Sequence, residues 1–129
     1  MLKNTVAIVI AGLIIIVTLN LSGSGNKDGY TPTDKNVSVE NSKQIVEIKV
    51  KGGYSPYISL AKADMPTILR MKTSGSFDCS SAVAIPSIGY RSNLPLSGIT
   101  DIEIPSQKSG TVLQGRCAMG MYNFQVKFN

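Results

Sequence analysis

The chain opens with an apolar stretch. Residues 5–21 carry no charged side chain, Lys3 precedes them, and residues 6–17 contain no polar side chain. A run of this length stands at the short end of the roughly 17–25 residues that span a bilayer as a helix, so an uncleaved anchor and a cleaved signal peptide are both open. The continuation of the apolar run to Leu21 favours the anchor. We predict that residues 1–21 are a membrane anchor or signal segment.

A polar stretch follows. Residues 22–43 are rich in Ser, Gly, Asn, Thr, Asp and Lys. This composition is typical of a flexible tether, and we predict a polar linker over 22–43. Because Lys3 stands on the short N-terminal side, that end is expected in the cytoplasm. The C-terminal domain is then expected outside it, at the cell surface or in the periplasm, and secreted if the first segment is cleaved.

From Gln44 onward apolar residues recur at every second position, which is the period of a half-buried strand. The clearest case is the C-terminus, where Phe124, Val126 and Phe128 alternate with polar residues. About seven such short segments, separated by turn residues, fall within 44–129, and none has the pattern of an amphipathic helix. We predict one domain over 44–129, an antiparallel β-sandwich or small barrel.

One absence limits the possible chemistry. The 129 residues contain no histidine, which excludes Ser-His-Asp and Cys-His catalysis, His-containing zinc sites and the blue-copper ligand set. The nearest pair of carboxylates, Asp101 and Glu103, stands on one face of an expected strand and is interpreted as solvated surface. We therefore expect that the protein is not an enzyme.

The chain is mildly basic, with 13 Lys and Arg against 8 Asp and Glu and a formal charge of +5. The basic residues are scattered singly, and aromatic residues make up only 6%. Nucleic-acid binding needs a basic stripe with interleaved aromatic residues, so no nucleic-acid partner is expected.

Sulfur is concentrated near the C-terminus. Residues 116–121 contain Cys117, Met119 and Met121, and the only other cysteine is Cys79. Soft thiolate and thioether donors select copper(I), and a glycine between two methionines lets a short loop fold around one ion. Two alternatives stay open: the two cysteines form a structural disulfide, and the two methionines fill gaps in a core. Composition alone favours the disulfide, whereas the adjacent Met-Gly-Met favours a metal.

Five short pieces of sequence are informative together: residues 52–56, 73–75 leading to 79–81, 85–89, 94–96 and 117–121. In that order they closely resemble a family of small cupredoxin-like (plastocyanin-like) domains. These domains occur in exported prokaryotic proteins and attached to heavy-metal-transporting P-type ATPases. The resemblance implies an all-β fold, a cupredoxin-like Greek-key β-sandwich, here preceded by one N-terminal hydrophobic helix.

The resemblance also implies a ligand set. Cys79 corresponds to the mid-chain copper ligand of that family, Cys117 to its copper-binding cysteine and Met121 to its axial methionine, which leaves Met119 as the remaining donor. The expected cofactor is copper, with Cu(I) favoured because the set has two thiolates and no imidazole. The chain departs from the family pattern at Ala118, where glycine is more usual, and in extra residues around 76–78.

These observations predict an exported copper-binding protein for extracytoplasmic copper storage, buffering or transfer. The expected partners are the copper ion, a copper transporter or other metal-handling protein, and the membrane through the N-terminal segment. The alternative is a disulfide-closed β-sandwich that serves as a structural or protein-interaction module without metal. A third possibility, an electron-transfer protein, is disfavoured by the absence of imidazole.

Overall fold

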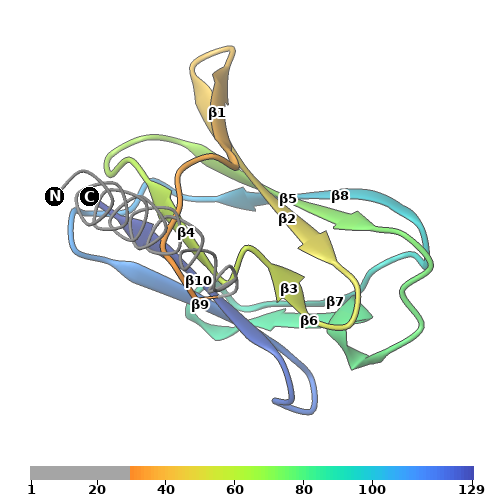
Figure 1. Ribbon diagram of the computed structural model, residues 1–129. Helices are drawn as coiled ribbons and strands as arrows, with labels where there is room; N and C mark the ends of the chain where they lie inside the picture. Colours follow the sequence, from red (N-terminus) through yellow and green to blue (C-terminus); the bar gives the residue numbers. More distant parts are fainter. Residues whose placement is uncertain (1–29) are drawn as a thin grey trace, which may run out of the picture.

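The computed structural model of the protein describes residues 30–129 (Figure 1). The predicted anchor or signal segment 1–21 lies outside the described residues, as do residues 22–29 of the predicted linker. Within residues 30–129, no helix is long and apolar enough to cross a membrane.

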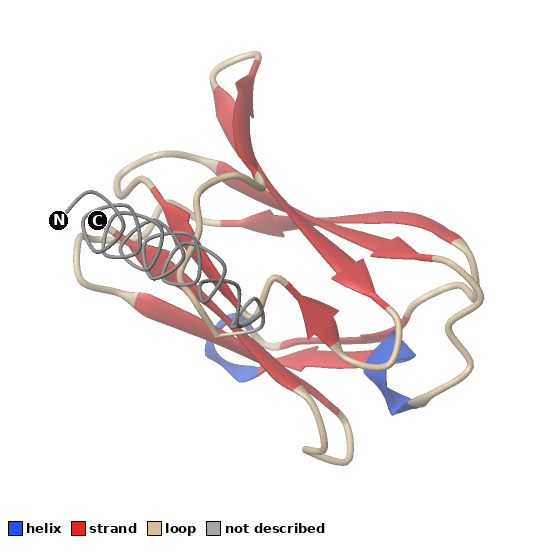
Figure 2. Cartoon of the chain, viewed as in Figure 1, coloured by secondary structure: helices blue, strands red, loops and turns tan. Residues whose placement is uncertain are grey.

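The described part of the chain consists almost entirely of short strands joined by turns (Figure 2). Two single-turn 3₁₀ helices interrupt the strands, η1 (Cys79–Ser81) and η2 (Pro86–Ile88). The strands are β1 (Val37–Glu40), β2 (Lys43–Val50), β3 (Tyr54–Ser55), β4 (Ile58–Ala61), β5 (Thr67–Thr73), β6 (Ala82–Ile85), β7 (Tyr90–Asn93), β8 (Gly98–Ile104), β9 (Val112–Cys117) and β10 (Asn123–Phe128).

The strands form two five-stranded sheets, one above the other in Figure 1. The first sheet has the order β1-β2-β5-β8, with β3 paired to β2, and the second has the order β4-β10-β9-β6-β7. The pairs β2–β5 and β4–β10 are parallel. The remaining pairs are antiparallel.

These pairings correct the predicted fold class, an all-β cupredoxin-like Greek-key β-sandwich with antiparallel strands. Both sheets are mixed, and each contains one parallel pair. The N-terminal hydrophobic helix of that prediction lies outside the described residues. Alternation of apolar residues determines which face of a strand is buried, but the pattern is the same beside a parallel or an antiparallel neighbour. After β2 the chain crosses to the other sheet for β4 and returns as β5, and parallel pairs require such a crossover.

Regular secondary structure begins before Gln44, the predicted start of the domain. Strand β1 lies within the stretch predicted as a polar linker and pairs with β2. Asn36 holds this stretch in place, because its side-chain amide donates to the Glu47 carbonyl and to the Ser59 hydroxyl, each at 2.8 Å. Hydrogen bonds, and not buried apolar side chains, hold this stretch in place. Its composition is therefore polar, which is why the sequence predicted a linker there.

The core lies between the sheets and follows the predicted alternation. Phe124, Val126 and Phe128 are fully buried, as are the inward residues of β2 and β5. Met71 is also fully buried and belongs to this core. The core cluster includes Val46, Ile48, Val50, Tyr54, Leu69, Met71, Val83, Ile85, Leu113, Cys117, Phe124, Val126 and Phe128.

Candidate metal centre

The fold brings the two cysteines together. Cys117 ends β9 and is fully buried, whereas Cys79 begins η1 and is partly buried. Their Sγ atoms lie 3.1 Å apart although 38 positions separate them in sequence. The reason is topological: η1 leads directly into β6, and β6 pairs with β9 so that Val83 stands opposite Cys117.

Asp78 fixes the turn that carries Cys79. Its Oδ1 accepts hydrogen bonds from the backbone N–H of Ser80 at 2.8 Å and from the Ser80 hydroxyl. Its Oδ2 accepts from the backbone N–H of Gly52 at 2.8 Å. The carboxylate therefore caps η1 and ties it to the β2–β3 turn.

Tyr54 also binds the turn that carries Cys79. Its hydroxyl donates to the Ser80 carbonyl at 2.8 Å, and its ring packs against Phe124 with centroids 4.9 Å apart. Burial, with smaller contributions from the nearby thiols and Asp78, raises the pKa of Tyr54, so the phenol stays protonated and remains a donor. The contact with Ser80 could not be predicted from the sequence, because the two residues it joins are 26 positions apart.

The segment after Cys117 forms a tight loop that projects from the bottom of the molecule in Figure 1. The Gly120 N–H donates to the Cys117 carbonyl at 2.9 Å, and Gly120 takes a φ of 72°. The Cys117 N–H donates to the Tyr122 carbonyl at 2.9 Å and closes the loop. Ala118 does not have a positive φ, so an alanine fits at this position without backbone strain.

The loop surrounds the Cys117 sulfur with donors. Burial acts to raise the pKa of this thiol, but hydrogen bonds to the sulfur outweigh it and leave the pKa of Cys117 below its ordinary value. The Tyr122 N–H, for example, lies 3.4 Å from Sγ. Conversely, donation to Cys117 raises the pKa of Cys79. The donors to Cys117 come from Tyr122, Cys79, Met121 and Met119. Of the two thiols, Cys117 is therefore the one that loses its proton more easily.

The two methionines stand at the same end of the molecule but face solvent. Met119 is 79% exposed and Met121 is 66% exposed. The interpretation that they fill a core is therefore wrong. Within residues 30–129 no three His, Cys, Asp or Glu side chains gather as a metal site.

The donor chemistry suits a soft ion. Two thiolates that bind one ion at about 2.3 Å in tetrahedral geometry lie about 3.8 Å apart. The observed 3.1 Å separation needs only a small outward rotation of the Cys79 side chain, which is partly exposed. Two exposed thioethers in the adjoining loop are then available to complete the coordination.

Removal of the cap is expected to loosen the Cys79 turn. In the reduced, metal-free protein, Asp78→Ala should lower the thermal midpoint by about 5 °C, because an N-cap and a loop-to-loop tie are lost. Alkylation of Cys79 by iodoacetamide should accelerate several-fold. Circular dichroism and mass spectrometry measure the two effects. Asp34→Ala is the matched control, because the exposed Asp34 makes no side-chain hydrogen bond within residues 30–129. Equal behaviour of the two variants would contradict the assigned role.

Comparisons with known proteins place the fold among copper-binding proteins. The metal-binding domain of the Cu(I)-exporting P-type ATPase CopA of Streptococcus pneumoniae D39, solved with Cu(I), superposes with a TM-score of 0.63 and 19% identity. The match covers 72% of this chain and 92% of that one. A copper-binding protein solved by NMR in its apo form superposes with a TM-score of 0.66 and 21% identity, covering 75% of this chain and 98% of that one.

At these identities the likeness is one of fold. No protein-family model and no curated protein matches the chain. Copper, the ion predicted from the sequence, is the ion named for both solved structures, and Cu(I) is named for one of them.

Proposed function

We propose that the protein binds Cu(I) through the thiolates of Cys79 and Cys117, with Met119 and Met121 as thioether ligands. The observation that carries the proposal is the 3.1 Å separation of the two sulfur atoms beside an exposed Met-Gly-Met loop. The fold neighbours that bind copper support it.

The ligand set favours Cu(I) over Cu(II). Soft thiolate and thioether donors prefer the monovalent ion, and a protein without histidine has no imidazole to stabilise Cu(II). Hydrogen bonds to the Cys117 sulfur lower the pKa of this thiol, which favours the thiolate form that binds a soft metal. Such a site holds copper in one oxidation state, which suits a carrier or store better than an electron-transfer protein.

The proposed role is copper storage, buffering or transfer outside the cytoplasm. The apolar run at residues 5–21, preceded by Lys3, supports export with the domain tethered to the membrane or released from it. The proposed partner is a copper transporter or another metal-handling protein, and one of the fold neighbours is a domain of a Cu(I)-exporting ATPase.

A competition titration tests copper binding. The full chain, in neutral detergent and reduced under nitrogen, is titrated with Cu(I) against a coloured Cu(I) chelator. We expect the protein to withdraw copper from the chelator and to lose this ability after both thiols are alkylated. A titration that matches buffer alone would refute the proposal.

The second candidate function is that of a disulfide-closed structural or interaction module. The observation in its favour is the same sulfur contact, since a small movement also allows an S–S bond. A free-thiol assay on natively purified protein separates the candidates. Two reactive thiols support the metal site, whereas thiols that appear only after reduction support the disulfide.

A further inference from the structure

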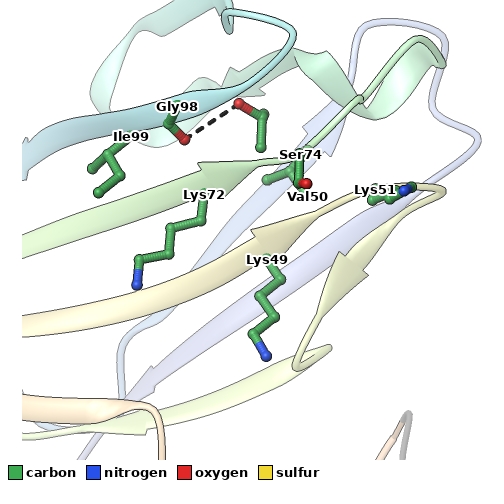
Figure 3. A pocket seen from close by; sticks show the side chains of 8 residues that line it. Lys49, Val50, Lys51, Lys72, Ser74, Gly98 and Ile99 are labelled. Atoms are coloured by element: carbon green, nitrogen blue, oxygen red, sulfur yellow. Dashed lines mark hydrogen bonds between the residues drawn. The ribbon is translucent and has the colours of Figure 1, made fainter.

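A groove of about 440 Å³ lies on the outer face of the first sheet, across the ends of β2, β5 and β8 (Figure 3). Its sides carry three lysines and one exposed isoleucine. The residues that line it are Lys49, Val50, Lys51, Lys72, Thr73, Ser74, Gly98 and Ile99.

The lysines are close because of strand register. Lys49 in β2 stands opposite Lys72 in β5, and Lys72 stands opposite Ile99 in β8. Figure 3 shows the side chains of Lys49 and Lys72 extending in the same direction from neighbouring strands.

Internal ion pairs compensate only part of that charge. Lys72 pairs with Glu47, with Nζ and Oε2 2.9 Å apart. Lys49 and Lys51 are exposed and form no ion pair within residues 30–129. Beside them Ile99 is 61% exposed. The groove therefore presents uncompensated positive charge next to an apolar side chain.

Two hydrogen bonds connect the groove to the segment that carries Cys79 of the candidate metal centre. Lys51 is followed by Gly52, whose N–H binds the Asp78 carboxylate at 2.8 Å. The Ser76 hydroxyl donates to the Val50 carbonyl. Through these two contacts the strand end that lines the groove also holds the loop that leads to Cys79. A molecule seated in the groove thus lies beside the metal-bearing end of the sheet.

The charges farther along the same face limit the size of the occupant. Asp101 follows Ile99 by two residues on the outer face of β8 and pairs with Arg70 at 2.9 Å. Glu103 comes two residues later. An extended anionic surface, such as a bilayer or a nucleic acid, would meet these carboxylates, whereas a short acidic segment can lie over the unpaired Lys49 and Lys51 without reaching them. The complementary ligand is a short peptide segment with acidic residues around an apolar one.

We propose that this groove is the docking site for an acidic, apolar segment of the protein that exchanges copper with the thiol pair. This inference rests on the proposed function. Opposite charges steer the encounter and fix its orientation, and rim charges act mainly on the association rate and its salt dependence. Lys49 and Lys51 would supply the charge, and Ile99 the apolar contact.

The test uses amide chemical shifts of the ¹⁵N-labelled full chain in neutral detergent. The probe is a capped hexapeptide, Glu-Glu-Leu-Phe-Glu-Glu, and its counterpart with lysine in place of glutamate is the control peptide. We expect shifts at residues 49–51, 72–74 and 98–99 with the acidic peptide only. The double variant Lys49→Glu/Lys51→Glu should raise the dissociation constant at least tenfold. Lys108→Glu, an exposed lysine near the start of β9, should leave it within twofold.

The outcomes are distinct from those of the copper test. Unchanged Cu(I) competition by the double variant, with loss of peptide binding, supports the docking site as a surface separate from the metal ligands. Scattered shifts, or equal weakening by Lys108→Glu, would overturn the proposal even if copper binding holds. Loss of binding to phosphatidylglycerol vesicles in the double variant, without peptide shifts, would instead assign the groove to lipid headgroups and overturn it too.

Discussion

Cys117→Ser is expected to lower the affinity for Cu(I) by more than about 100-fold, since changes one shell beyond a metal ligand already cost about 10–100-fold. The serine oxygen is a hard donor, and its hydroxyl ionises far less readily than a thiol. The site would also lose its most buried ligand. The measurement is the chelator competition on reduced protein, with circular dichroism to establish that the variant folds.

Matched variants separate ligand loss from a packing defect. Cys79→Ser, at the less buried sulfur, should give a comparable loss of affinity with a smaller effect on stability. Met119→Leu and Met121→Leu should each weaken binding by about tenfold. Met65→Leu, at a methionine in another loop, should leave it unchanged. Wild-type affinity in both cysteine variants would refute the assigned ligands.

Gly115→Ala is expected to destabilise the protein by about 3 kcal/mol, at the upper end of what overpacking costs. Gly115 in β9 stands opposite Phe124 in β10, and a β-carbon at this position would coincide with the ring of Phe124. That ring is fully buried and packs against Tyr54, so it has no free space into which to move. Urea unfolding of the reduced, metal-free protein measures the change.

A double-mutant cycle identifies the cause. Phe124→Leu removes the ring that the new methyl group meets, so the destabilisation of Gly115→Ala/Phe124→Leu should be clearly less than the sum of the single effects. Gln114→Ala, one residue away and exposed, should change the stability by less than about 0.5 kcal/mol. Strict additivity in the cycle would contradict the steric explanation.

The alternation of apolar and polar residues was sufficient to predict which side chains form the core. The alternation at Val46, Ile48 and Val50 and at Phe124, Val126 and Phe128 predicted which side chains enter the core, and all six are buried. It did not predict strand direction, because parallel and antiparallel neighbours bury the same face. It also missed β1, whose stretch is held by the Asn36 hydrogen bonds and buries few apolar side chains.

The candidate site, too, could be predicted from the sequence only in part. The types of donor were evident in the sequence, since Cys117, Met119 and Met121 are near neighbours and Cys79 is the only other cysteine. Their supports were not, because Asp78 reaches Gly52 and Tyr54 reaches Ser80 only across the fold, 26 positions apart in each case. Hydrogen bonds between residues far apart in the chain produce no periodic sequence pattern, so they could not be predicted.

The sequence by itself determined the inward and outward faces of the strands and the softness of the Cys-Met donor set, since both are properties of side chains and their spacing. The tertiary structure alone decided that Cys79 and Cys117 meet at 3.1 Å and that Lys49, Lys72 and Ile99 form one row across three strands. The physical reason is that contacts between strands depend on register and crossover, which are set by the whole core at once.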